Sequence, residues 1–314
     1  MELRHLAAFV AVAEERNFGR AASRLHMTQS PLSRRIRLLE RDLDVVLFER
    51  TTRAVELTPA GEALLAPARR VLAEAETARA AVRAHDAGVV GRVSLGFAGA
   101  TSYDLVPRLT RAVATRLPGI EMSLACPVYA HDAMHRVADG SLDLGVVAMP
   151  ARVGIATRVV SSEPLLVALP EDHRLTGRDE VALAELVAEP FVSFPISSGS
   201  AVAEASLRAC ADAGFTPSIA QEAPDAYNLL TLVGAGVGIA LVVASARHIR
   251  TDHVVFRPVR DAVPPMLIAL AWQAEHVSPA VRAVLAVADE VLPTPMPIGT
   301  DQSAGSDLDS LNPA

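Results

Sequence analysis

The spacing of apolar residues changes near Gly88 and Gly91, and this change divides the chain into two parts of different fold class. Before it, apolar residues recur every three or four positions, as at Leu32, Ile36 and Leu39, which is the spacing of amphipathic helices. After it, short apolar runs alternate with helical segments. A chain of 314 residues is long enough for about two domains. We therefore expect a helical N-terminal domain followed by α/β structure.

Seven short apolar runs predict strands in the second part. They cover residues 93–97, 121–125, 142–147, 165–169, 191–194, 237–243 and 267–272. Helical segments fall between them, which is typical of βαβ units and a mostly parallel sheet, and the number of strands favours two α/β lobes. One uncharged stretch, residues 226–246, is long enough to span a bilayer. Its glycines and its change from helical to β-branched spacing indicate a buried helix followed by a buried strand instead.

A long alanine-rich helix is expected to join the two parts, after a short hairpin at residues 48–58. Thr58 is suited to cap this helix, Pro59 suits its first position, and strong helix formers continue to residue 83. Pro67 is expected to kink the helix or to be absorbed by packing. The helix carries an apolar stripe that needs a covering surface, which self-association would supply. The stripe consists of Leu64, Leu65, Val71, Leu72, Ala75 and Ala78.

The segment from Arg16 to Arg37 carries six arginines and no carboxylate, although the formal net charge of the chain is −7. Residues 1–90 hold 14 Arg against 12 Asp and Glu, a net charge of +2. Residues 91–314 hold 15 Arg against 24 Asp and Glu, a net charge of −9. The acidic balance belongs to the second part, so a polyanionic partner is compatible with the first.

Two short helices and a tight turn are expected within this arginine-rich segment. With Thr28 as N-cap, Gln29 and Pro31 lie in the first turn of the second helix, and Met27 and Leu32 take the positions of a hydrophobic staple. Leu32, Ile36, Leu39 and Leu43 share one face, and Ser30, Ser33, Arg34, Arg37 and Arg41 lie opposite. This pattern favours a helix-turn-helix whose second helix enters the DNA major groove. The alternative is a structural helical hairpin with solvated arginines.

Several segments resemble a known family. The first 65 residues or so resemble the DNA-binding domain of the LysR-type transcriptional regulators: MELRHLAAFVAVAEERNFGRAASRLHMTQSPLSRRIRLLERDLDVVLFERTTRAVELTPAGEALL. Later segments resemble the effector-binding domain of that family in the same order: GRVSLGFAGATSYDLVPRL, LPGIEMSL, DGSLDLGVV, FVSFPISSGS, ACADAGFTP, QEAPDAYNLLTLVGAGVGIALV and LIALAWQ. The resemblance is greatest to the members that control breakdown of aromatic compounds.

The resemblance implies an α/β protein with an N-terminal winged helix-turn-helix, a long linker helix and a two-lobed effector domain like a periplasmic binding protein. We expect the DNA-binding domain at residues 1–58, the linker and dimerisation helix at 59–90 and the effector-binding domain at 91–292. Within the last, lobe I takes about 91–162 and 267–292, and lobe II about 163–266. The remaining tail, residues 293–314, is rich in Pro, Ser, Gly and Asp and is expected to be disordered.

The resemblance also assigns residues to DNA. Gln29, Ser30, Pro31, Ser33 and Arg34 would face base edges of double-stranded promoter DNA, and Arg37, Arg50 and Arg53 would face its backbone or minor groove. One such helix reads only a few bases, so pairing through the linker helix is physically expected as well. The family implies a homodimer or homotetramer that bends promoter DNA and contacts RNA polymerase when a small-molecule effector binds.

An effector cleft is expected between the lobes, at the carboxyl ends of strands. Its candidate residues are Ala100, Thr101, Ser102, Val128, Tyr129, Pro195, Ile196, Ser197 and Ser198. Helix N-termini in these loops favour an anion, although such serines usually serve only as helix caps. Ala100 stands where the aromatic-compound subgroup commonly has serine, and Val128 and Tyr129 add apolar surface. An aromatic or more hydrophobic acid is therefore at least as well suited as a muconate-like diacid.

Patterns for catalysis and metal binding are weak. The sequence HDAMH, from His131 to His135, places two imidazoles four residues apart, but no third metal ligand is evident. Walker A and GxSxG motifs are absent, and GAGVGIA precedes its strand instead of following one. Cys126 and Cys210 show no pairing pattern, which together with the absence of a leader indicates the cytoplasm, and a redox switch is an alternative.

We therefore expect no enzyme activity, no cofactor, no metal and no membrane association. The competing interpretation is a two-lobed small-molecule-binding protein or enzyme whose helical N-terminal domain has no DNA role.

Overall fold

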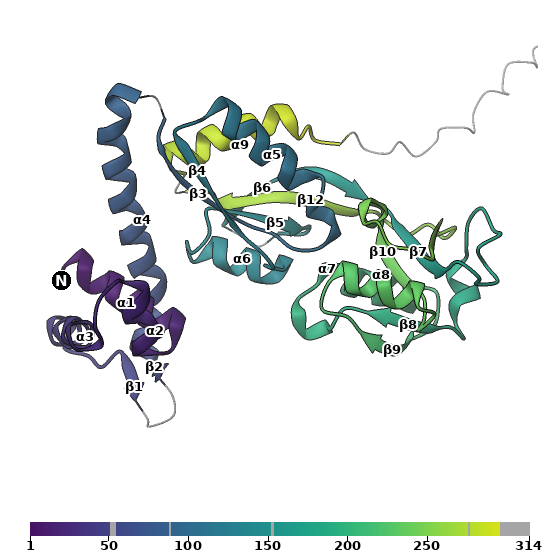
Figure 1. Cartoon of the computed structure of the whole chain (residues 1–314), viewed down its shortest axis with the longest axis horizontal. Helices are drawn as coiled ribbons and strands as arrows, with labels where there is room; N and C mark the ends of the chain where they lie inside the picture. The colour runs from purple at the N-terminus through teal and green to yellow at the C-terminus, as the bar shows by residue number, and fades with distance from the viewer. Residues whose placement is uncertain (51–54, 88, 152–153, 276, 296–314) are drawn as a thin grey trace, which may run out of the picture.

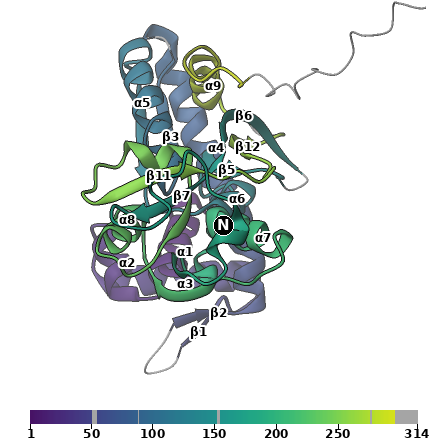
Figure 2. The same cartoon turned by 90° about the vertical axis from the view of Figure 1, so that its right-hand side faces the viewer.

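The computed structural model describes residues 1–50, 55–87, 89–151, 154–275 and 277–295. A small helical domain, one long helix and two α/β lobes follow one another along the chain (Figure 1). The small domain contains α1 (Leu3–Glu15), α2 (Phe18–Arg24), α3 (Gln29–Leu43) and a hairpin of β1 (Phe48–Arg50) and β2 (Val55–Leu57). The helices and the hairpin predicted from apolar spacing are thus confirmed. The hairpin projects from one end of this domain (Figure 2).

The small domain is held together by aromatic and aliphatic side chains from each of its elements. The ring centroid of Phe48, in the hairpin, lies 5.4 Å from that of Phe9 and 6.0 Å from that of Phe18. Helix α3 contributes Leu32, Ile36 and Leu39, which are all fully buried. Burying such side chains stabilises the fold by about 1.5–3 kcal/mol each. The buried face fixes which side of α3 is left for solvent.

Helix α4 (Pro59–Ala87) is the expected long linker helix, and Pro67 lies inside it without ending it. Thr58 caps it, because its Oγ1 accepts a hydrogen bond from the Gly61 amide at 3.1 Å. A Cβ at Gly61 would lie 2.3 Å from the Leu47 carbonyl oxygen, so the first turn of α4 can approach the hairpin only without a side chain there.

The apolar stripe of α4 is covered in part by this same chain. Leu64, Leu65 and Leu72 pack against the core of the small domain. Val71 is 42% exposed. The expectation that the whole stripe needs a second molecule is therefore wrong for its N-terminal half, and only the remainder is left to be covered.

Lobe I is a five-stranded sheet with helices on both faces. Its strands are β3 (Gly91–Gly96), β4 (Ile120–Ala125), β5 (Leu144–Ala148), β6 (Ile155–Glu163) and β12 (Met266–Gln273), in the order β4-β3-β5-β12-β6. Helices α5 (Leu105–Arg116) and α9 (Pro279–Val291) share one core with the sheet. Helix α6 (Ala130–Ala138) packs on the opposite face, as Figure 1 shows.

Lobe II is smaller and has two short sheets. Strand β7 (Leu165–Pro170) is the centre of the first, between β10 (Ala240–Val243) and β11 (Val254–Pro258), and β8 (Pro190–Ser193) pairs with β9 (Ser218–Glu222) in the second. Helices α7 (Ala201–Asp212) and α8 (Ala226–Gly234) pack against them. Four short 3-10 helices complete the described fold: η1 (Ala100–Ser102), η2 (Leu183–Leu186), η3 (Ile196–Ser198) and η4 (Ala244–His248).

The strand predictions were incomplete in number and in direction. The seven predicted strands exist, but β6, β9 and β11 were missed. Every residue of β9 is exposed, and β6 has one buried residue, so neither carries an apolar run. The expected mostly parallel sheet is correct for β3 with β4 and β5 and for β8 with β9. It is wrong for β12 and β7, which pair antiparallel with both neighbours.

The uncharged stretch 226–246 forms α8, β10 and the start of the next short helix. Within the described ranges, no helix has the length and apolarity to cross a membrane. Most of the predicted disordered tail, residues 296–314, lies outside the described residues.

Candidate nucleic-acid interface and ligand pocket

The exposed face of α3 carries most of the residues that the sequence assigned to DNA. Gln29, Ser30, Pro31, Arg34 and Arg37 are exposed and Ser33 is half-buried. Thr28 precedes the helix as expected, but its side chain makes no capping hydrogen bond. The first-turn amides of α3 are therefore left free on the same surface, where an anion would be favoured.

Arg16 follows the end of α1, and the other five arginines of the segment 16–37 fall into two groups. On α2, Arg24 forms an ion pair with Glu14 at 2.7 Å, and Arg20 forms one with Glu15 at 3.4 Å. Both carboxylates come from the end of α1, outside the arginine-rich segment. On α3, by contrast, Arg34 has no carboxylate partner anywhere in the described chain.

Arg35 and Arg37 on α3 are likewise without an ion pair to any described residue. The uncompensated positive charge is therefore concentrated on α3. The arginines of α2 fasten it to α1, a division of roles that the sequence alone did not show.

Two of the arginines assigned to DNA, Arg50 and Arg53, belong to the hairpin segment. Arg50 is the last residue of β1, and Arg53 lies outside the described residues. The hairpin is fixed relative to α3, because the Leu47 amide donates to Glu40 Oε1 at 2.9 Å.

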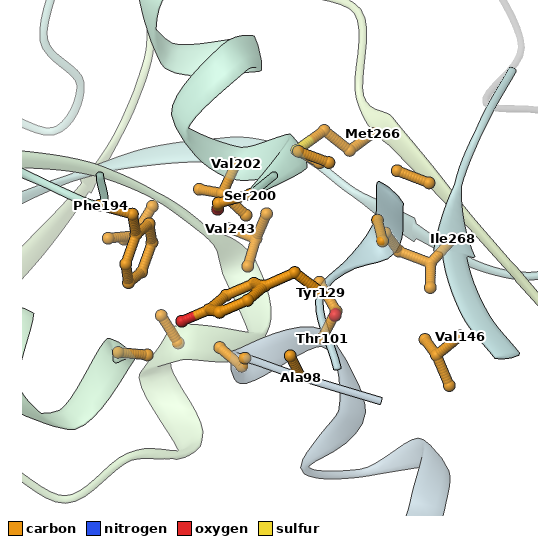
Figure 3. A pocket seen from close by; sticks show the side chains of 18 of the residues that line it. Ala98, Thr101, Tyr129, Val146, Phe194, Ser200, Val202, Val243, Met266 and Ile268 are labelled. Carbon is orange, nitrogen blue, oxygen red and sulfur yellow. The ribbon is translucent and has the colours of Figure 1, made fainter. Parts of the chain in front are cut away.

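A pocket lies between the two lobes and encloses about 650 Å³, including its open mouth. Its walls are mainly apolar side chains from both lobes, among them Val146, Phe194, Val202, Val243 and Ile268 (Figure 3). Thr101, Tyr129 and Ser200 supply hydroxyl groups, and no charged side chain lines it. Small-molecule sites in proteins have this balance of apolar walls and few polar groups.

The structure brings three of the predicted effector residues to this pocket: Ala100, Thr101 and Tyr129. Ser102 lies outside it, because it is 1% exposed and its Oγ donates to the Gly99 carbonyl at 2.7 Å. Val128 lies outside it as well, since it is 3% exposed and packs in the core between α6 and the sheet.

The four predicted residues of the second loop also lie outside the pocket. Ser198 donates to the carbonyl of Pro195 at 2.6 Å, and Ile196 and Ser197 are exposed to solvent. The loop forms a 3-10 turn, and none of these four residues lines the pocket. The residues that flank it, Phe194 and Ser200, line the pocket instead.

Most pocket residues were missed because their sequence signal is that of ordinary core. The missed residues are Ala98, Gly99, Ala130, Val146, Val147, Ala148, Phe194, Ser200, Ala201, Val202, Ala226, Leu230, Val242, Val243, Ala246, Met266 and Ile268. Apolar residues at the ends of β5, β10 and β12 have the same pattern whether they face a core or a cavity. One signal was available: small residues at helix starts leave room for a ligand to approach the backbone.

Three helices begin at the pocket wall. Ala130, Ala201 and Ala226 are the first residues of α6, α7 and α8, and each lines the pocket. The first amides of a helix have no acceptor within it, and the helix dipole places partial positive charge there. Asp225 caps α8 with a carboxylate, which accepts from the Asn228 amide at 2.9 Å and would repel an anion. Helix α6 has no side-chain cap and α7 has the uncharged Ser200 as its cap, so these two helix starts suit an anionic group better than the start of α8 does.

Tyr129 connects the two lobes across the pocket. It precedes α6 in lobe I, and its hydroxyl donates to the carbonyl of Pro224 in lobe II at 2.6 Å. Burial, and after it the Asp225 carboxylate, raises the pKa of Tyr129 above its usual value, so the phenol keeps its proton at neutral pH. A second link joins His131 Nδ1 to Glu204 Oε1 at 3.5 Å. The pocket is thus spanned by polar contacts between the lobes.

Histidine and cysteine side chains form no further site in the described part of the chain. His131 and His135 lie on α6, and no group of three potential metal ligands occurs among the described residues. Cys126 is exposed, whereas Cys210 is buried, and both are free thiols. Burial raises the pKa of Cys210 to about 11, so this thiol stays protonated and unreactive.

A helix-turn-helix with an arginine face, joined by a long helix to a two-lobed domain with a small-molecule pocket, defines a ligand-responsive DNA-binding protein. Comparisons with known proteins agree. The family description "Bacterial regulatory helix-turn-helix protein, lysR family" matches residues 3–62, and "LysR substrate binding domain" matches residues 86–293. The chain therefore belongs to the LysR family of transcriptional regulators, and it is not an enzyme.

Individual relatives cover nearly the whole chain. The HTH-type transcriptional regulator ShiR of Corynebacterium glutamicum (strain R) is 42% identical over 273 residues, 87% of this chain and 92% of ShiR. AlsR of Bacillus subtilis (strain 168), also an HTH-type transcriptional regulator, is 31% identical over 90% of this chain and 93% of its own length. Full-length CbnR, crystallised with its target DNA, superposes with a TM-score of 0.69 at 31% identity, covering 93% of this chain and 100% of CbnR.

Proposed function

We propose that this regulator reads promoter DNA with α3 and changes transcription of a catabolic or related operon when a small organic acid enters the pocket. The proposal that α3 binds DNA is supported by its row of arginines, which have no carboxylate partner within the described ranges. Gln29, Ser30, Pro31, Ser33 and Arg34 contact base edges, and Arg37, Arg50 and Arg53 contact the sugar-phosphate backbone or the minor groove. Guanidinium groups that are not neutralised by the protein are available to phosphates and guanine edges.

The effector in this proposal is an aromatic or otherwise apolar acid. Apolar walls favour a hydrocarbon body, and the starts of α6 and α7 favour a carboxylate without any arginine or histidine in the lining. Thr101, Tyr129 and Ser200 provide hydroxyl groups for the polar part of the ligand. An aliphatic diacid fits less well, because its second carboxylate would meet apolar wall or approach Asp225.

The assembly is proposed to be a homodimer or homotetramer that contacts RNA polymerase. Val71 and Ala78 of the α4 stripe are exposed, so they are available to a second molecule. Pairing through α4 would place two copies of α3 on neighbouring half-sites, which a single helix needs for selective binding. The proposed functional units are residues 1–58, 59–90 and 91–292.

The DNA half is tested by gel retardation with the promoter region upstream of the protein's own gene. Arg34→Ala is expected to weaken binding by roughly 1–3 kcal/mol and to relax base preference at one position, because a bidentate arginine contact discriminates between bases. The matched control is Arg111→Ala on α5, an exposed arginine in the effector domain, which should bind as wild type does. Equal binding by Arg34→Ala and wild type would contradict the assignment of α3.

A further inference from the structure

One guanidinium of the linker helix contacts both domains that the helix joins. Arg69 of α4 donates through Nη1 to Asp139 Oδ2 at 2.7 Å, and Asp139 follows the last residue of α6 in lobe I. The same side chain donates through Nε and Nη2 to Glu14 Oε1, at 3.2 and 3.0 Å, and Glu14 lies near the end of α1. The Arg69 side chain is 15% exposed, whereas Glu14 and Asp139 are 28% and 33% exposed, so the bridge is partly shielded from solvent at its centre.

The bridge continues at both ends. The other oxygen of Glu14, Oε2, pairs with Arg24 Nη1 of α2 at 2.7 Å. The other oxygen of Asp139, Oδ1, accepts from the Ser141 amide at 2.9 Å. Each carboxylate thus binds a different partner with each oxygen. The result is an unbroken chain of charged contacts from α2, in the helix-turn-helix, to the loop after α6; we call it the Arg69 bridge.

Helix α6 connects the Arg69 bridge to the pocket. Its first residue, Ala130, lines the pocket, and Asp139 follows its last turn. At nine residues the helix is roughly 13 Å long. Ala133, Met134 and Val137 are buried against the sheet of lobe I, so the short helix is held as one continuous segment that links its two ends.

Arg69 also stabilises the negative charge of Asp139. A carboxylate at the C-terminal end of a helix lies beside partial negative charge and is destabilised there. The Arg69 guanidinium offsets this repulsion. A displacement of α6 along its axis would change the distance between Asp139 and Arg69, and Arg69 cannot follow without leaving Glu14.

We propose that Arg69 is a positioning residue through which occupancy of the pocket and DNA binding by α3 influence each other. The inference rests on the proposed function and adds the route of regulation. Coupling between two binding affinities is reciprocal, so binding of DNA must also change the affinity of the pocket. We expect this change to act through the pocket end of α6. This reciprocity allows a test that needs no knowledge of the natural effector.

The native thiol Cys126 reports on the pocket end of α6. It is exposed and lies four residues before Ala130, whereas Cys210 is buried and unreactive. The experiment measures the rate at which iodoacetamide alkylates Cys126 in the full-length protein, with and without saturating promoter DNA. In the wild type we expect saturating DNA to change this rate, because a shift at the pocket end of α6 alters the exposure of the neighbouring thiol. A purely local role of Arg69 in stability would not change the difference between the two rates.

Arg69→Met and Asp139→Asn are each expected to bind the promoter fragment and to lose this difference. Arg70→Met is the matched control, since its guanidinium is exposed on the next position of α4 and forms no ion pair with a described residue. It should keep the wild-type response. Asp139→Asn serves as the second variant because it preserves the shape of the side chain and removes only the charge.

The outcomes separate the two proposals. Absence of DNA binding by the wild type, seen by gel retardation of the same samples, overturns the proposed function and this inference with it. DNA binding that leaves the Cys126 rate of the wild type unchanged overturns only the inference. The inference also fails if Arg69→Met and Asp139→Asn both keep the full DNA-dependent change in rate.

Discussion

The DNA-binding face of α3 and the pocket between the lobes are built in opposite ways. The face consists of neighbours on one helix, and its orientation follows from three buried side chains of that same helix, Leu32, Ile36 and Leu39. The pocket gathers residues from position 98 to position 268, contributed by both lobes. A functional surface of the first kind can be read from a short stretch of sequence. A surface of the second kind exists only after the strands have paired.

The two surfaces also differ in the source of their polarity. On α3 the polar groups are side chains, and arginines without a partner in the described ranges dominate. In the pocket the lining has no charged side chain, and the strongest polar groups are backbone amides at helix starts. Substitutions should therefore affect the two surfaces in different ways.

Removing the buried side of α3 should disable the DNA-binding face and spare the pocket. Ile36→Ala is expected to reduce the free energy of unfolding of the small domain by about 2–5 kcal/mol, because Ile36 is fully buried. Urea denaturation followed by circular dichroism measures the loss, and gel retardation measures the effect on DNA binding.

Arg35→Ala is the control one position away, and its unfolding free energy should stay within about 0.5 kcal/mol of wild type. If Ile36→Ala unfolded the effector domain in the same transition, the two regions would form one cooperative unit. The DNA-binding face and the pocket would then differ in how they are built but would not be independent in stability.

We expect the pocket to bind an organic acid through the partial positive charge of the backbone amides at the start of a helix. Benzoate at 100 times its dissociation constant would stabilise the wild type by roughly 2.7 kcal/mol, seen as a rise in Tm. Ala201→Asp places a carboxylate at the first position of α7, where it suits the helix but repels an anionic ligand. We expect this variant to lose the benzoate-dependent rise.

Ser197→Asp adds the same charge to the exposed loop outside the pocket and should keep the rise in Tm. Stabilisation by benzoate that is equal in Ala201→Asp and wild type would show that the acid does not bind at the start of α7.

Two serines of one loop should differ in their contribution to stability. Ser200 is buried, and its Oγ accepts from the Ala203 amide at 3.4 Å, so it caps α7. Ser200→Ala is expected to cost about 1 kcal/mol in the free energy of unfolding, whereas Ser197→Ala should change it by less than about 0.5 kcal/mol. Thermal denaturation of both variants makes the comparison. An equal loss in the two would mean that the cap contributes little.

The same contrast explains what the sequence could and could not predict. The cap at Thr58, the fully buried Leu32 and Ile36, and the exposed Arg34 all follow from helical periodicity and from preferences of neighbouring residues, and the structure agrees with each. The ion pairs of Arg20 and Arg24 could not be predicted, because Glu15 and Glu14 belong to a different helix.

The sequence predicted the position of the pocket between the lobes but only a few of the residues that line it. Tyr129 was identified because it departs from the family pattern in a loop that was already expected at the cleft. Val128, its neighbour, points into the core, and nothing in the sequence distinguishes the two directions. The loop from Pro195 to Ser198 was predicted to line the cleft because of its hydroxyl groups. The Ser198 hydroxyl instead donates a hydrogen bond to the Pro195 carbonyl of the same loop. Such choices depend on local turn geometry that residue preferences do not determine.

The three alanines that begin α6, α7 and α8 have a consequence for how effector preference can diverge. Among the ordinary substitutions only proline deletes a main-chain amide, so the proposed acid-binding feature of the cavity would persist through most changes in its walls. Replacing Ala148, Val202 or Met266 by larger or smaller side chains would change the shape of the apolar part of the pocket and leave the backbone amides at the helix starts unchanged. Descendants of such a gene could thus acquire new inducers by resizing, with no change in how the acid group is held.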